Sequence, residues 1–151
     1  MKTKIYLLAA ILLAALTIVG CQKEKSSPTV DNSAKIVGEW HCAPEQYDVD
    51  VYVAFYADGA FDEYQRIGEG RYRHYNGTWT INKDTLSGVY SDGESWGSEY
   101  SVAFADNTMV LTSLNDSAEA MTYTKEQIPS EVIESAIEPL ASRSEQESRW
   151  F

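Results

Sequence analysis

Apolar and polar residues alternate along the middle of the chain. Val49, Val51 and Val53 occupy every second position of residues 49–57, with more polar residues between them. A period of two puts alternate side chains on opposite faces of an extended segment, so the pattern predicts a half-buried β-strand. Similar short runs recur between turn residues, and the predicted strands are residues 35–42, 49–57, 60–66, 71–82, 85–90, 96–104, 108–114 and 118–125.

Short turn sequences join these predicted strands. Asp58-Gly59 separates two of them, and such a pair predicts a tight hairpin with positive φ at both residues. Successive hairpins give an antiparallel meander, and closing a meander into a barrel removes its two exposed edges. No long helical pattern separates the strands, which argues against a parallel α/β sheet. We therefore predict an all-β domain, an eight-stranded antiparallel meander barrel over residues 35–128.

The hydrophobic pattern changes after residue 128. The apolar residues there share one face of a short helix, and they are Val132, Ile133, Ala136, Ile137 and Leu140. Ser130 is the expected N-cap, and Pro139 is expected to end the helix near Ile137. Residues 129–151 are therefore predicted to form a short C-terminal helix and a polar tail.

The beginning of the chain has the pattern of an export signal. Two lysines precede the apolar residues 5–19, a run shorter than the roughly 20 residues of a membrane-spanning helix. The run ends in Ile-Val-Gly-Cys at residues 18–21, which resembles the lipobox of bacterial lipoproteins. The resemblance implies that residues 1–20 are a signal peptide, cleaved between Gly20 and Cys21, and that the thiol of Cys21 is acylated. The alternative is a plain secretory signal followed by a chance cysteine.

Acylation at Cys21 would place the protein in the cell envelope, on the periplasmic or surface leaflet of the outer membrane. Stable anchoring takes more than one acyl chain, of which palmitate is an example. Residues 21–34 are polar and contain a proline, so they are predicted to form a flexible tether. Cys42 is the other cysteine of the chain. It is then left without a disulfide partner, and we expect it to be a small buried apolar residue.

The charge balance excludes some partners. The net charge is −11, which argues against nucleic acids and anionic lipid headgroups. The basic residues Arg66, Arg71, Arg73 and His74 cluster in the sequence. They form either a solvated face or a contact for an anionic ligand.

Catalysis has little support in the sequence. No serine-hydrolase, zinc-protease or phosphate-loop motif is present. His41 and His74 belong to different predicted strands, and Glu39 and Glu63 would meet as a catalytic pair only by accident of folding. We therefore expect no enzyme activity, no metal site and no cofactor.

Two short motifs point to a family. Gly38-Glu39-Trp40 and Gly77-Thr78-Trp79 resemble the Gly-x-Trp signature of lipocalins, in which the indole plugs the closed end of the barrel and the glycine lets the backbone bend. Together with the Asp-Gly hairpin and a final Tyr-x-Lys strand before Ile-Pro, the pattern over roughly residues 35–129 is similar to small lipocalin-like lipoproteins of Bacteroidetes. The resemblance implies a lipocalin-like barrel with Gly38, Trp40, Gly77 and Trp79 as its structural signature. The alternative is that both tryptophans are ordinary core residues.

Aromatic residues are abundant, with ten tyrosines and four tryptophans. Tyrosine offers an apolar face and a polar tip, and several at a barrel mouth could hold an apolar or amphipathic ligand. The candidate ligand-binding residues are Tyr52, Tyr64, Arg71, Arg73, Tyr75 and Trp96. The alternative is that aromatics simply suit a twisted sheet.

The leading functional hypothesis is therefore a lipid-anchored, lipocalin-like module that binds a small apolar or amphipathic ligand. The alternative is a non-catalytic protein-interaction or inhibitor module of the envelope whose barrel core is solid. An interior cavity of about 300 Å³ or more would favour the binder, whereas bulky side chains at every inward position would favour the alternative.

Overall fold

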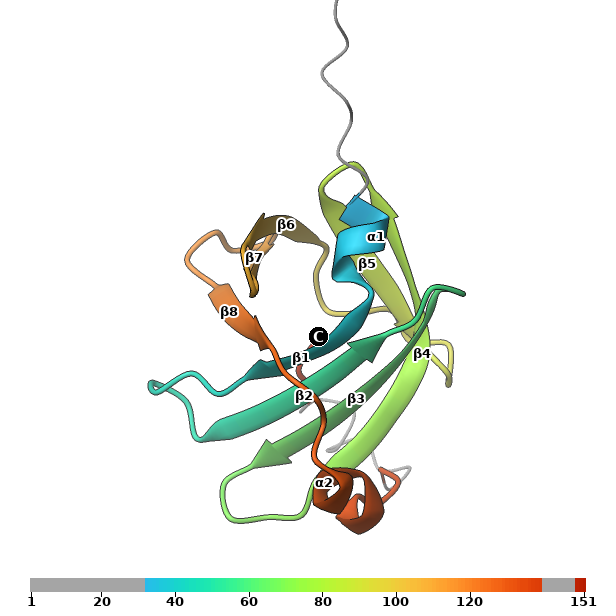
Figure 1. The fold of residues 1–151 in the computed structure, drawn as a ribbon, viewed down its shortest axis with the longest axis vertical. Coiled ribbons are helices and arrows are strands. Elements are labelled where there is room, and N and C mark those ends of the chain that lie inside the picture. Colours follow the sequence, from blue (N-terminus) through green and yellow to red (C-terminus); the bar gives the residue numbers. More distant parts are fainter. Residues whose placement is uncertain (1–31, 140–148) are drawn as a thin grey trace, which may run out of the picture.

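The fold is a closed barrel of eight antiparallel strands (Figure 1). The computed structural model describes residues 32–139 and 149–151. Each strand pairs with the next one in sequence, and β8 returns to pair with β1. The predicted eight-stranded antiparallel meander barrel is thereby confirmed. The elements are α1 (Asn32–Ile36), β1 (Gly38–Cys42), β2 (Val49–Phe55), β3 (Ala60–Ile67), β4 (Arg73–Asn82), β5 (Thr85–Tyr90), β6 (Tyr100–Ala105), β7 (Thr108–Ser113), β8 (Ala120–Lys125) and α2 (Ser130–Ser135).

The first strand is shorter than predicted because a helical turn precedes it. Residues 35 and 36 belong to α1, and a single residue separates this helix from β1. The side chain of Ile36 is fully buried, and its carbonyl oxygen accepts a 2.7 Å hydrogen bond from Nε1 of Trp40. Contacts with the barrel therefore override the extended pattern that the sequence shows at these two residues.

The hairpin between β2 and β3 is confirmed, but its predicted two-residue turn is wrong. Strand β2 ends at Phe55, and the turn spans Tyr56 to Gly59 with a 3.1 Å hydrogen bond from the Gly59 amide to the Tyr56 carbonyl. Gly59 has a φ of 86°, and Asp58 is not among the residues with positive φ. The longer loop therefore needs the left-handed conformation only at its glycine.

Side chains of the strands alternate between the barrel interior and its outer face. On β2, Val53 and Phe55 join the interior cluster around Trp40, whereas Tyr52 and Ala54 join a second cluster. That second cluster contains Val132 of α2, so α2 packs on the outer face of the sheet near β2 and β3. In Figure 1, α2 lies below these strands and outside the ring.

The C-terminal helix is shorter than predicted. Helix α2 ends at Ser135, and Ala136 is already extended. Ile137 runs beside β4, with its carbonyl accepting a 3.0 Å hydrogen bond from the His74 amide. The predicted helix end near Ile137 is therefore wrong, since backbone pairing with β4 draws the chain out of the helix before Pro139.

The cap and the buried face of α2 also differ from the prediction. Ser130 is the first residue of α2, and the N-cap position is held by Pro129 with no side-chain hydrogen bond. Val132 is buried as predicted, but Ile133 is 48% exposed. A helix of six residues is too short to bury the whole predicted apolar stripe.

The predicted state of Cys42 is confirmed. Its thiol is free and buried, and burial raises its pKa to about 12. Other predictions lie outside the described residues, namely the signal peptide 1–20, the cleavage and acylation sites at Gly20 and Cys21, most of the tether, Leu140 and the tail to residue 148. Among the described helices, none has the length and apolar character needed to span a bilayer.

Candidate functional site at the open end of the barrel

One end of the barrel is closed by α1 and the tryptophan of the first strand. Trp40 is 2% exposed, and the ammonium group of Lys125 lies 5.4 Å from the centre of its indole ring. Gly38 has a φ of 137°, and a Cβ added there would lie 3.1 Å from Cε of Lys125. The glycine therefore serves both the backbone bend and the cation–π contact with Trp40.

Gly77 and Trp79 lie on β4 and stabilise the packing of the barrel wall. A Cβ at Gly77 would lie only 2.1 Å from the carbonyl oxygen of Val89 on β5. Nε1 of Trp79 donates a 2.9 Å hydrogen bond to the carbonyl of Ala60, and its ring lies edge-on to Phe55 at 5.6 Å. Both residues therefore have structural roles.

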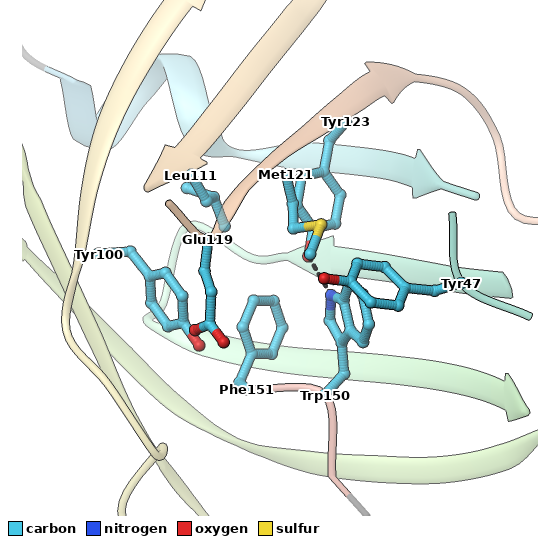
Figure 2. Close-up of a pocket in the computed structure, with 8 residues that line it drawn as sticks. All are labelled: Tyr47, Tyr100, Leu111, Glu119, Met121, Tyr123, Trp150 and Phe151. Carbon is cyan, nitrogen blue, oxygen red and sulfur yellow. Dashed lines mark hydrogen bonds between the residues drawn. The ribbon is translucent and has the colours of Figure 1, made fainter. Parts of the chain in front are cut away.

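The opposite end of the barrel contains a cavity of about 240 Å³. At this end the chain connects β1 to β2, β3 to β4, β5 to β6 and β7 to β8. Most of the cavity lining is aromatic or apolar, as Figure 2 shows. The residues that line it are Tyr47, Tyr100, Leu111, Glu119, Met121, Tyr123, Trp150 and Phe151. Its volume is slightly below the range of about 300–1,000 Å³ that is usual for ligand pockets.

The last residues of the chain lie inside the barrel. The C-terminal label in Figure 1 falls within the ring of strands, and Phe151 is 5% exposed. Its ring stacks on Trp96 with a centroid distance of 4.3 Å. Nε1 of Trp150 donates a 2.6 Å hydrogen bond to the Tyr123 hydroxyl, drawn as a dashed line in Figure 2. The cavity is therefore the space that this segment leaves unfilled.

Glu63 on β3 is a fully buried carboxyl group in the same interior. The Tyr90 hydroxyl donates a 3.3 Å hydrogen bond to one of its oxygens, and the backbone N–H of Trp150 also bonds to it. Among the described residues, its other oxygen has no hydrogen-bond partner. Burial raises the pKa of Glu63 to about 8 despite these donors and the nearby Arg149, so the interior holds an acid that is mostly protonated at neutral pH.

A second cavity, of about 430 Å³, lies where β3 and β4 are joined. Arg71, Arg73 and Tyr75 line it, together with Gln65 and Ile137. Arg71 also donates a 2.8 Å hydrogen bond to the Ser135 carbonyl. Three of the candidate ligand-binding residues are thus brought together at the same end of the barrel as the aromatic cavity.

Comparison with known families agrees with this architecture. The sequence model of a family described as a lipocalin-like domain matches residues 29–111, which is more than half of the chain. The chain belongs to this lipocalin-like family. No curated protein matches the sequence.

The lipocalin-like barrel separates the six candidate ligand-binding residues. Tyr52 and Tyr64 lie on the outer face in the cluster that contains Val132. Tyr75 and Trp96 belong to the interior cluster. Tyr52 and Tyr64 therefore contact α2 and not the cavity, because their positions on β2 and β3 have the opposite parity to the inward residues.

Trp96 is not in a strand, although the pattern predicts one from residue 96. It lies in the connection before β6, which begins at Tyr100. The Trp96 amide donates a 3.0 Å hydrogen bond to the Gly88 carbonyl, and a Cβ at Gly88 would lie 2.2 Å from the indole. The missing side chain of Gly88 therefore provides the space for this ring.

The two histidines of the lipocalin-like domain lie in separate outer-face networks. His41 lies 2.8 Å from Asp50 and stacks on Tyr52. His74 lies 2.6 Å from Asp62, and this hydrogen bond raises its pKa. Within residues 32–139 and 149–151, no group of three potential metal ligands is found. Lipocalin-like domains are typically binding proteins.

Glu39 and Glu63, for which the sequence offers no reason to expect a catalytic pair, lie on opposite faces of the sheet. Glu39 accepts a 2.9 Å hydrogen bond from the Ile128 amide, whereas Glu63 belongs to the interior. Sequence reasoning did not single out Glu63, Arg149, Trp150 or Phe151 as parts of the site. The alternation of Phe61, Glu63 and Gln65 is the signal that could have placed Glu63 inside.

Proposed function

We propose that this lipocalin-like domain binds a small apolar or amphipathic ligand at the open end of its barrel. The observation that carries the proposal is the cavity of about 240 Å³ with an aromatic and apolar lining. The opposite end is closed by α1 and Trp40, so a ligand has one route to the interior. Arg71 and Arg73 at the second cavity offer contacts for a polar or anionic group at the rim.

The test is a titration of the full chain with N-phenyl-1-naphthylamine and palmitate, followed by tryptophan and probe fluorescence. Met121 lines the cavity, and Met121→Trp is expected to weaken binding about tenfold by filling it. Thr122 is the exposed neighbour on β8, so Thr122→Trp is the matched control and should bind as the native chain does. Absence of any fluorescence change with either probe would contradict the proposal.

We further propose that acyl chains on Cys21 anchor the protein in the outer membrane. The lipobox-like residues 18–21 and the apolar run before them support this proposal. Metabolic labelling with a palmitate analogue should mark the native chain, and Cys21→Ser should abolish the label. An unlabelled native chain, or a labelled Cys21→Ser chain, would contradict anchoring at this residue.

The alternative function, a protein-interaction or inhibitor module with a solid core, is favoured by one observation. Trp150 and Phe151 already occupy much of the interior, and the remaining cavity is below the usual ligand-pocket range. The Met121→Trp experiment separates the two functions, since a solid-core module would show no probe binding to lose.

A further inference from the structure

Arg149–Phe151 occupies the barrel interior without forming part of its wall. The ladder of strand pairs closes from β1 to β8 through backbone pairing that does not involve these three residues. A cavity remains directly beside Trp150 and Phe151. The segment is therefore placed as a ligand would be, inside a barrel that is already complete.

The interior provides a subsite for the cation of this segment. The Arg149 guanidinium lies 4.3 Å from the centre of the Tyr90 ring and 5.5 Å from that of Tyr75. It also pairs with the carboxylate of Asp92, with one Nη1–Oδ1 contact of 3.2 Å. Two aromatic faces and a carboxylate are the groups that recognise a guanidinium or ammonium ion.

Separate subsites take the two aromatic side chains. The indole N–H of Trp150 is bonded to the Tyr123 hydroxyl. The ring of Phe151 lies between Trp96, at 4.3 Å, and Tyr123, at 6.4 Å, with both rings nearly parallel to it. The order along the segment is thus a cation, a hydrogen-bonded indole and a stacked phenyl ring.

The backbone of the segment is also recognised. Glu63 accepts from the Trp150 amide, and Tyr90 donates a 3.2 Å hydrogen bond to the main-chain oxygen of Phe151. A fully buried carboxyl group is unfavourable in a core that only needs to be filled. Its presence here is explained if the interior recognises the peptide N–H group of an occupant.

We propose that the barrel interior is a recognition site for a peptide with the order cation, indole, phenyl ring, and that Arg149–Phe151 fills this site within its own chain. The proposal rests on the proposed ligand-binding function and names the class of its ligand, a cationic aromatic peptide. An external ligand of this class must then displace Arg149–Phe151 in order to bind.

The test compares the full native chain with the full chain carrying Trp150→Ala and Phe151→Ala, using the peptide acetyl-Arg-Trp-Phe in calorimetric titrations. The tethered segment competes at an effective concentration in the millimolar range, so the double variant is expected to bind the peptide at least about tenfold more tightly than the native chain. Acetyl-Glu-Trp-Phe should bind the double variant at least about tenfold more weakly, because its acid would face the carboxylate of Asp92, where the guanidinium of Arg149 lies in the native chain. Ile133→Ala, on the exposed face of α2, is the matched control and should bind as the native chain does.

A second variant guards against loss of folding. Arg149→Ala keeps both aromatic side chains in the core and removes only the cation, and it is expected to raise peptide affinity severalfold. The proposal is overturned if the folded double variant binds acetyl-Arg-Trp-Phe no better than the native chain does. If the double variant does not fold, the same result for the folded Arg149→Ala chain overturns it. Equal binding of acetyl-Glu-Trp-Phe and acetyl-Arg-Trp-Phe also overturns it.

The outcomes for N-phenyl-1-naphthylamine separate this proposal from the broader function. If the native chain and the double variant bind this neutral probe equally and neither binds the peptide, the proposed ligand-binding function stands and the inference about Arg149–Phe151 is wrong. If the double variant gains peptide binding while no form binds N-phenyl-1-naphthylamine or palmitate, the inference stands and the broader function is wrong for apolar and fatty-acid ligands.

Discussion

The side chain of Glu63 lies in an unusual environment for a glutamate, which is normally exposed on a protein surface. It is fully buried among aromatic residues of β3, β4 and β5, and this burial raises its pKa to about 8. Its pKa is lowered in part by Tyr90, Arg149 and the Trp150 amide inside the barrel, and least by the charge of His74 on the outer face. The native state therefore holds a proton on Glu63 at pH values where the unfolded chain has lost it.

This proton predicts a stability that falls as pH rises. The unfolded pKa of glutamate is about 4.3, so between that value and about 8 the native state binds more protons than the unfolded state. The free energy of unfolding should decrease by up to about 1.4 kcal/mol per pH unit in this window. Chemical denaturation from pH 5 to 6.5 measures the slope, which Glu63→Gln should largely remove.

The control for Glu63 must account for His74. The raised pKa of His74, caused mainly by its hydrogen bond to Asp62, gives stability that is present below about pH 6.5 and is lost as pH rises further. The slope between pH 5 and 6.5 therefore belongs mainly to Glu63. Glu134 is exposed on α2, so Glu134→Gln should keep the native slope, and a slope unchanged by Glu63→Gln would contradict the prediction.

The roles of single residues were predictable where they depend on local sequence. The bend at Gly38 and the burial of Trp40 and Cys42 follow from a short motif and a strand pattern. The cation over Trp40 does not, because Lys125 reaches it only through the pairing of β1 with β8. Glu63 was missed for a similar reason, since its partners come from β5 and from the end of the chain.

The connection between β5 and β6 depends on a glycine. Trp96 packs against Gly88 so closely that a Cβ would lie 2.2 Å from the ring. The same ring stacks on Phe151 and lies edge-on to Phe61 at 5.3 Å. Gly88 therefore allows this loop to place an aromatic ring in the interior.

Substitution of this glycine should be strongly position-dependent. Gly88→Ala is expected to destabilise the protein by about 1–3 kcal/mol, because the methyl group displaces Trp96 from a packed interior. Gly97 is the matched control, since the nearest atom that its Cβ would meet is the Phe151 oxygen at 4.0 Å. Gly97→Ala should change stability by no more than about 0.5 kcal/mol. Thermal unfolding of the two variants measures the difference, and equal losses would contradict this account of Gly88.

Helix α2 offers a similar comparison on the outer face. Val132 is 5% exposed and packs with Tyr52, Tyr64 and Tyr72, whereas its neighbour Ile133 is 48% exposed. Val132→Ala should lower the free energy of unfolding by on the order of 1–3 kcal/mol. Ile133→Ala should cost less than about 0.5 kcal/mol. Urea denaturation tests the pair, and a larger loss for Ile133→Ala would show that α2 packs differently.

Strands were more predictable than the elements that flank them. The period-two pattern located all eight strands because alternation is a local property, and only the ends of β1 and β6 moved by several residues. Helices α1 and α2 are five and six residues long, too short for a periodic pattern to define. Their positions come from contacts of Ile36 and Val132 with a barrel that the local sequence does not describe.

The barrel closes through seams of unequal strength. Strand β2 pairs with β3 along its whole length, whereas β5 and β6 pair only at Thr85 with Ser101 and at Leu86 with Tyr100. The β1–β8 seam is also short, but the cation–π contact between Lys125 and Trp40 supports it. The β5–β6 seam is therefore the place where the barrel is expected to open most readily.

Hydrogen exchange can measure this opening and its link to the C-terminal segment. The amides of residues 100–102 should exchange about tenfold or more faster than those of residues 51–54, a difference of at least about 1.4 kcal/mol in opening free energy. Phe151 accepts a hydrogen bond from Tyr90 at the end of β5 and lies edge-on to the ring of Tyr100 on β6 at 5.8 Å, so it ties the two sides of the seam together. Trp150→Ala with Phe151→Ala should therefore speed exchange in residues 100–102 and leave residues 51–54 nearly unchanged. Uniform acceleration along the chain would mean that the segment stabilises the whole fold and does not act at the seam.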